Sequence, residues 1–142
     1  MDARGVYHSH RPLDLCPRGL TGEGMGLALL SAMALAVCPP GPRSHCVHDG
    51  DTVWLSGEKI RIADIDTPEL NGRCTSESDL AVASRDRLLN LLNTAPFVVR
   101  RQGKDRYGRT LAVLSRDGRS IGAILVDEGL ARPWTGKRQP WC

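Results

Sequence analysis

Charged side chains are crowded into one short stretch of the chain, RIADIDTPEL, at residues 61–70. Arg61, Asp64, Asp66 and Glu69 are interleaved there with isoleucines, in a pattern that begins like a β-strand. Charges beside a protein core are costly unless they are paired or bind a metal. The stretch therefore predicts a site where carboxylates and a guanidinium act together, and a solvated ladder of charges is the alternative interpretation.

Two further clusters are candidates for the same site. The first is DGDT at residues 49–52, which is weak evidence by itself because Asp-Gly pairs are ordinary turn formers. The second is RRQGKDRYGRT at residues 100–110, where five basic residues and Tyr107 accompany a single acidic residue, Asp105. Such a local basic excess suits a phosphate-bearing partner, although a charged loop in solvent is the commoner explanation.

Taken together, the three clusters favour phosphodiester chemistry. Asp51, Asp66 and a backbone carbonyl would supply hard oxygen ligands, which suit Ca²⁺ or Mg²⁺ rather than zinc. Glu69 would serve as the general base if it is not a ligand. Arginine forks from Arg61 and Arg109 would stabilise charge on the phosphorus in a bidentate way that lysine does not match.

Turn residues divide the chain from residue 44 onward into short elements that must position these side chains. We expect a strand interrupted by the turn at 49–51, a hairpin turn at 56–58 and a partner strand at 59–65. If that strand is regular, Asp64 and Asp66 share one face of it. Pro68 then ends the strand and lets Glu69 return toward the same face.

The second half of the chain predicts two helices and further strands. Ser76 and Asp79 resemble a capping box for a helix of about four turns that stops near Ala95. Strands are expected at 97–101 and 110–115, and Ser120 is expected to cap a short helix that ends at Gly129. This order predicts an α+β fold with a compact, closed sheet.

The N-terminal segment differs in character from the rest of the chain. Residues 25–37 form an unbroken run of apolar and small residues that is too short to span a bilayer comfortably. The run fits the core of a signal peptide with cleavage after Ala36, and a buried helix is the alternative. We therefore expect 1–43 to be a leader with a Pro-rich linker, 44–142 to be the folded domain, and the protein to be secreted or periplasmic.

The cysteines are compatible with export. The chain has five of them, and none has the CxxC or Cys/His spacing typical of zinc sites. Cleavage after Ala36 would leave Cys38, Cys46, Cys74 and Cys142, which allow three pairings. Disulfides are expected in an exported protein, whereas buried reduced cysteines are the alternative.

Composition sets broader limits. A length of 142 residues suits one domain with a real core, and a net charge of +3 is too small to establish a polyanionic partner. Only 4% of the residues are aromatic, which argues against a platform that grips single strands mainly by stacking. We expect a monomer without a stable membrane span.

Four motifs in order, DGDT, KIRIADIDTPE, DRYGR and IGAILVDEGLA, resemble the staphylococcal nuclease-like (thermonuclease) family over about residues 46–134. The resemblance implies a five-stranded OB-fold β-barrel with two or three packed helices. It also implies Ca²⁺-dependent hydrolysis of DNA and RNA with little sequence preference, which leaves 3′-phosphorylated products.

The resemblance also assigns roles to individual residues. It makes Asp51 and Asp66 the calcium carboxylates, Thr67 a carbonyl ligand, Glu69 the general base, and Arg61 and Arg109 the phosphate-binding arginines. Arg106 and Tyr107 fall where the family contacts a terminal phosphate of the nucleotide.

The chain departs from the family pattern in its tail and at one site position. After Ala131 only RPWTGKRQPWC follows, so the long C-terminal helix and its base-stacking tyrosines are missing, and Trp134 is a partial substitute. Asp64 stands where the best-known member has an apolar residue. The alternative function is a noncatalytic nucleic-acid-binding module on the same barrel, but every catalytic position holds the required residue type.

Overall fold

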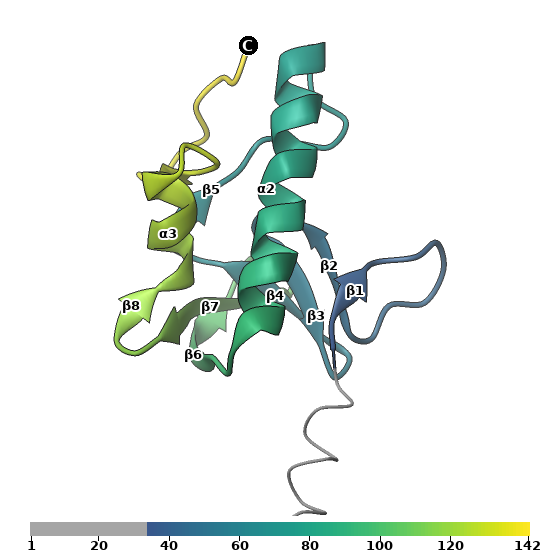
Figure 1. Ribbon diagram of the computed structural model, residues 1–142, viewed down its shortest axis with the longest axis vertical. Coiled ribbons are helices and arrows are strands. Elements are labelled where there is room, and N and C mark those ends of the chain that lie inside the picture. Colours follow the sequence, from purple (N-terminus) through teal and green to yellow (C-terminus); the bar gives the residue numbers. More distant parts are fainter. Residues whose placement is uncertain (1–33) are drawn as a thin grey trace, which may run out of the picture. The chain divides into compact units, whose positions relative to one another are not determined.

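A meander of antiparallel strands forms the centre of the main sheet (Figure 1). The structure, a computed structural model, describes residues 34–142. Strands β2 (Cys46–Asp49), β3 (Thr52–Leu55) and β4 (Glu58–Ile62) pair in sequence order. Ser56 and Gly57 join β3 to β4 with φ angles of 49° and 84°, the left-handed conformations that suit a tight hairpin turn. The predicted hairpin is therefore confirmed.

The remaining strands extend this meander and add a second, smaller sheet. Strand β7 (Thr110–Arg116) lies parallel to β4, and β6 (Val98–Lys104) pairs with β7 in the antiparallel direction. At the other end of the sheet, β1 (Ala36–Val37) lies parallel to β2. A short strand, β8 (Arg119–Ser120), also pairs with β7. The second sheet joins β5 (Ile65–Asp66) to β9 (Arg132–Pro133).

Two helices pack on these strands in the described part of the chain, α2 (Thr75–Thr94) and α3 (Ile121–Asp127) (Figure 1). Their apolar side chains meet those of the main sheet, where alternate residues of each strand point to the same face. The resulting core contains Val47, Val53, Ile60, Ile62, Leu88, Leu92, Ala112, Leu114, Ile121 and Leu125, all of them buried. The core fixes the strand ends that carry the charged residues.

The α+β class is confirmed, with two helices and mixed sheets in residues 34–142. Hydrogen-bonded neighbours run in the order β1-β2-β3-β4-β7-β6. Among the described strands, no pairing joins β6 back to β1. The structure therefore shows the sheets of the expected fold but not the closure of a barrel.

The predicted strand at 59–65 is wrong in its second half. The main-sheet strand ends at Ile62, residues 63 and 64 form a turn, and Ile65 starts the separate β5. Asp64 points away from the other carboxylates, because its Oδ2 accepts a hydrogen bond of 2.5 Å from the Ser120 hydroxyl. Asp64 and Asp66 therefore do not share a regular strand face, and Asp64 serves the packing of α3.

The predicted capping box at Ser76 and Asp79 is also wrong. The N-cap of α2 is Cys74, which makes no side-chain capping bond. Glu77 supplies the local hydrogen bonds instead, since its carboxylate accepts from the backbone N–H of Arg73 at 2.8 Å and of Glu69 at 3.4 Å. The first turn of α2 thereby holds the loop that carries Glu69. The predicted cap of α3 is confirmed, because Ser120 Oγ accepts from the Ala123 N–H at 3.1 Å.

The described residues, Ala34–Cys142, form one compact unit, and the domain boundary expected at residue 44 stays a prediction. Leu35 is buried, and its backbone N–H and C=O both bond to the Asn93 side-chain amide at 2.9 Å. The predicted signal segment at 25–37 lies mostly outside the described residues, and its cleavage stays a prediction. Within residues 34–142, no helix is long and apolar enough to cross a membrane.

Two disulfides staple the unit, as expected for an exported protein. One joins Cys38 to Cys46 and therefore ties the segment before β2 to the sheet. The other joins Cys74, at the start of α2, to the C-terminal Cys142. Cys16, the remaining cysteine, lies outside the described residues.

Candidate active site

Asp51 lies in the turn between β2 and β3 with only 4% of its surface exposed. The turn is tight, because Asp49 Oδ1 accepts the Asp51 backbone N–H at 3.2 Å. Residue 50 must be glycine, since a Cβ there would lie 2.1 Å from Ser84 Oγ on α2. Close packing of the turn on the helix thus fixes the Asp51 carboxylate, which accepts a 3.1 Å hydrogen bond from the Thr52 hydroxyl.

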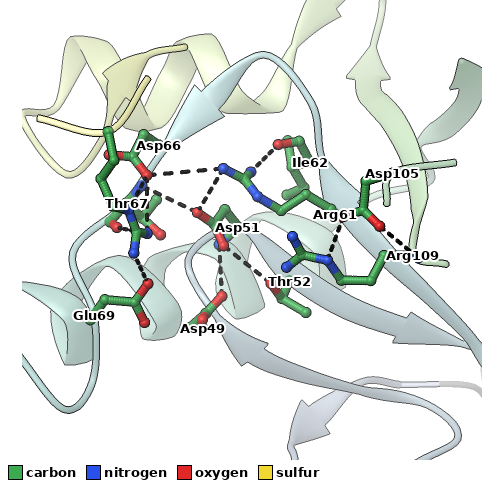
Figure 2. A network of polar contacts seen from close by, with 11 residues as sticks. Asp49, Asp51, Thr52, Arg61, Ile62, Asp66, Thr67, Glu69, Asp105 and Arg109 are labelled. Carbon is green, nitrogen blue, oxygen red and sulfur yellow. Dashed lines mark hydrogen bonds and ion pairs between the residues drawn. The ribbon is translucent and has the colours of Figure 1, made fainter. Parts of the chain in front are cut away.

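Strand β4 aims Arg61 at this carboxylate. Arg61 Nη2 lies 3.3 Å from Asp51 Oδ2 and 3.9 Å from Asp66 Oδ1, while Nη1 donates to the carbonyl of Ile62 (Figure 2). Two buried carboxylates from separate elements therefore converge on one guanidinium. Charge pairing of this kind is what allows both carboxylates to be buried.

The link between the carboxylates is completed by the residue after β5. The Thr67 backbone N–H donates to Asp51 Oδ2 at 3.3 Å, and Thr67 itself is buried. Its carbonyl oxygen lies on the same side as Asp66 Oδ1, since Arg138 Nη2 lies within 3.5 Å of the former and 3.1 Å of the latter. Asp51, Asp66 and Thr67 thus present oxygen atoms to one small region.

Glu69 lies two residues farther along, with 46% of its side chain exposed. Figure 2 shows it below Thr67, at the end of the network away from Arg109. Its carboxylate forms an ion pair with Arg138 from the C-terminal tail. Pro68 has ended β5 before it, so the expected return of Glu69 toward the carboxylates is seen.

The basic loop between β6 and β7 contributes from the other side. Asp105 Oδ1 accepts the backbone N–H groups of Tyr107 and Arg109 at 2.9 Å, and its Oδ2 accepts Arg109 Nε at 2.7 Å. The guanidinium carbons of Arg106 and Arg109 lie 4.9 and 5.6 Å from the centre of the Tyr107 ring. Asp105 is therefore the hub that orders this loop, a role that its sequence position did not indicate.

One open cleft of about 860 Å³ brings these groups together. Seven of the eight site residues expected from sequence line it: Asp51, Arg61, Asp66, Glu69, Arg106, Tyr107 and Arg109. Thr67 does not line the cleft, although its backbone joins the two carboxylates. Trp134 also lines it, with its ring centre 5.8 Å from the Arg61 guanidinium carbon.

Comparison with known proteins identifies the family of this chain. The sequence pattern of the family described as "Staphylococcal nuclease homologue" matches residues 59–140. The chain belongs to this family. The match begins in β4, so it includes all of the expected site residues except Asp51.

Three curated proteins are similar to this staphylococcal nuclease family chain over much of the chain's length. It is 32% identical over 97 residues to an "Uncharacterized endonuclease" of Haemophilus influenzae, with 65% of this chain and 50% of the relative covered. It is 31% identical over 115 residues to "Succinoglycan biosynthesis protein ExoI" of Rhizobium meliloti, covering 73% and 58%. It is 32% identical over 91 residues to "Endonuclease YncB" of Bacillus subtilis, covering 59% and 43%. The chain thus spans about half the length of these relatives.

Electrostatics single out Asp51 within the cleft. Burial and the nearby charge of Asp49 raise the pKa of Asp51 to about 6, against the opposing attraction of Arg61. Burial also lowers the pKa of His48, which lines the cleft, and the positive charges of Arg43 and Lys59 lower it further. The ionised form of Asp51 is therefore held in the folded chain at a cost in free energy.

The oxygen donors fit a hard cation. Asp51, Asp66 and the Thr67 carbonyl offer only oxygen, which is the donor set that Ca²⁺ prefers. A positively charged nitrogen of Arg138 already lies near two of these oxygens, Asp66 Oδ1 and Thr67 O, so the geometry accepts a cationic group. This cluster of oxygen atoms is thus chemically suited to a hard cation such as calcium.

Arg138 is the site residue that sequence reasoning missed. It comes from the tail, 69 positions after Glu69 in the chain, and no local pattern marks it. The available signal was Cys142, because pairing it with Cys74 places the tail next to the loop of Glu69. The sequence left three pairings open and so gave no reason to choose this one.

Proposed function

We propose that the chain is a calcium-dependent endonuclease that hydrolyses phosphodiester bonds of DNA and RNA with little sequence preference. The observation that carries the proposal is the meeting, in one cleft, of Asp51, Asp66 and Glu69 with Arg61 and Arg109. Family membership and similarity to two proteins named endonucleases support the same reaction class.

In this proposal the side chains divide the work of hydrolysis. Calcium, held by Asp51, Asp66 and the Thr67 carbonyl, would polarise the phosphate. Glu69 is exposed enough to meet a water molecule and accepts a proton as the water oxygen bonds to phosphorus. The bond from phosphorus to the 5′ oxygen breaks, that oxygen takes a proton from solvent, and the 3′ phosphate remains on the other fragment.

The arginines stabilise the charge that grows on the phosphate. Arg109 uses Nε for Asp105, and its two Nη groups make no hydrogen bond or ion pair within residues 34–142. A guanidinium oriented in this way can donate two parallel bonds to phosphate oxygens. Arg61, on the neighbouring strand β4, lies beside the carboxylates, while Arg106 and Tyr107 extend the cleft toward a terminal phosphate.

The absence of sequence preference follows from the composition of the cleft. Basic groups in its lining bind phosphate, and the exposed Trp134 and Tyr107 offer ring faces that any base can stack on. The two disulfides support action outside the reducing cytoplasm.

The test is digestion of plasmid DNA and of a structured RNA by the purified full-length protein, with calcium and with excess EGTA. We expect cleavage of both substrates with calcium, less with magnesium, and none with chelator. Substrate binding by gel shift without any cleavage in calcium would favour the noncatalytic binding module instead. Undiminished cleavage in EGTA would remove the calcium assignment and leave the nuclease assignment in place.

A further inference from the structure

The C-terminal tail is anchored on both sides of the candidate cation site. At its start β9 pairs with β5, with Arg132 opposite Asp66, and the Trp134 N–H donates to the Asp64 carbonyl at 2.9 Å. At its end the disulfide joins Cys142 to Cys74. Residues 135–141 therefore form a bridge whose two ends are fixed next to the carboxylates.

The bridge also has internal contacts that give it a defined course. The Arg132 guanidinium lies 3.7 Å from the centre of the Trp141 ring and donates to the Pro140 carbonyl at 2.8 Å. These contacts join the two ends of the bridge to each other. Arg138, between them, is held close to the site by the backbone on both sides.

All three nitrogens of the Arg138 guanidinium donate to the proposed calcium ligands and the proposed base. Nη2 and Nε lie 3.1 and 3.3 Å from Asp66 Oδ1, Nη2 lies 3.5 Å from the Thr67 carbonyl oxygen, and Nη1 pairs with Glu69. The Asp66 side chain is only 4% exposed, so this contact is made with a sheltered charge. Arg138 itself remains 48% exposed and can withdraw into solvent.

These contacts differ from those of Arg109, the proposed phosphate-binding arginine. Neither Nη group of Arg109 makes a hydrogen bond within residues 34–142, whereas the Arg138 guanidinium donates to Asp66, Glu69 and Thr67. A guanidinium and a divalent cation cannot both occupy the same carboxylate and carbonyl oxygens, because like charges repel at such distances. The same oxygens must therefore be shared by exchange.

We propose that Arg138 competes with calcium for Asp66 and Thr67, so that the tail sets the calcium affinity of the site, and that the Cys74–Cys142 disulfide maintains this competition. The inference rests on the proposed function, since it takes the cation to be calcium. When a competing group occupies the metal-free site, calcium has to displace it. The apparent calcium affinity then falls in proportion to the fraction of sites that the group leaves free. A charge-assisted contact to a sheltered carboxylate corresponds to a factor of about ten.

The experiment is calorimetric titration of calcium into the full-length, oxidised protein and its variants. Arg138→Gln is expected to bind calcium about tenfold more tightly than the unaltered protein. Lys137→Gln is the matched control, because it removes one positive charge from the neighbouring tail position, which makes no ion pair with Asp66 or Glu69. Its affinity should change by less than about twofold, since an exposed charge is largely screened.

A second pair of variants tests the disulfide. The double variant Cys74→Ser/Cys142→Ser, checked for cooperative urea unfolding, is expected to bind calcium more tightly than the unaltered protein. The same double change combined with Arg138→Gln should add nothing further, because the competing guanidinium is already gone. Additive gains in the combined protein would overturn the role given to the disulfide.

Other outcomes separate this inference from the proposed function. Unchanged or weaker calcium binding in Arg138→Gln, in a protein that binds calcium and cleaves DNA, overturns the competition alone. A raised KM for DNA with unchanged calcium affinity would make Arg138 a substrate contact and also overturn it. No calcium binding by any of the proteins would overturn the calcium site itself and the competition with it.

Discussion

The burial of Asp51 predicts an unusual pH dependence of stability in the metal-free protein. Its carboxyl has a pKa of about 6 in the folded chain against an ordinary value of 3.8. The folded state therefore keeps this proton over a pH range in which the unfolded chain has lost it. Because the native state binds more protons there, the free energy of unfolding falls as pH rises from about 4 to about 6.

The size of the effect follows from the shift. A rise of roughly two pKa units corresponds to about 3 kcal/mol of stability, present at pH 3 and lost by pH 7. Asp51→Asn cannot ionise and so carries no such dependence. The difference in unfolding free energy, variant minus unaltered protein, should therefore increase by about 3 kcal/mol between pH 3 and pH 7.

The assay is urea unfolding followed by tryptophan fluorescence, with calcium removed and the disulfides intact, at unit pH steps. Changes common to both proteins cancel in the difference. Asp105→Asn is a control of opposite sign. Burial alone would raise the pKa of Asp105, but hydrogen bonds from Arg109 and Tyr107 lower it. The difference in unfolding free energy between Asp105→Asn and the unaltered protein should therefore not grow with pH. A difference for Asp51→Asn that stays within about 1 kcal/mol over the whole range would refute the reasoning.

Three further predictions concern catalysis, the disulfides and the N-terminal segment. Glu69→Gln should lower kcat on single-stranded DNA by roughly 10² to 10⁴ with little loss of substrate binding, and Arg61→Lys and Arg109→Ala should also lower kcat; near-normal kcat in all three folded variants would place the reaction elsewhere. Removing Cys74–Cys142, which closes a loop of 68 residues, should cost about 4 kcal/mol in urea unfolding, whereas removing Cys38–Cys46, with a separation of 8, should cost about 2.5 kcal/mol; the reverse order would contradict the loop-entropy argument. A chain that begins at residue 37 should be less stable than one that begins at residue 34 by about 2 kcal/mol, because it lacks the buried Leu35; equal midpoints and slopes in urea would show that this side chain contributes little.

The sequence predicted the parts of the site whose geometry is local. Strand alternation around Arg61, the turn at Asp51 and the strand-ending Pro68 depend on neighbouring residues, so their patterns indicated which side chains would lie together. The short helix capped by Ser120 was predictable for the same reason. Local rules of turn and cap chemistry were enough in each case.

The errors involve contacts that the local sequence patterns did not reveal. The strand breaks after Ile62 because Asp64 bonds to Ser120 and Ile65 pairs with Pro133, and neither partner is visible from the local pattern. Glu77 replaces the expected capping pair because the loop before α2 is turned back onto the helix. Tertiary contacts overrode the strand pattern after Ile62, whereas at the start of α2 a different local acceptor, Glu77, replaced the expected one.

The C-terminal tail is the clearest case in which distant contacts place a charged group at the site. A short strand pairing and a disulfide fix the backbone on either side of residues 135–141. The disulfide acts mainly by limiting the unfolded chain rather than by adding buried area. The consequence is a positive charge, Arg138, brought to Asp66 and Glu69 by an exposed segment. Such a charge stabilises the carboxylates when no other cation is bound and can be exchanged when one is, which a guanidinium embedded in a packed helix would do far less readily.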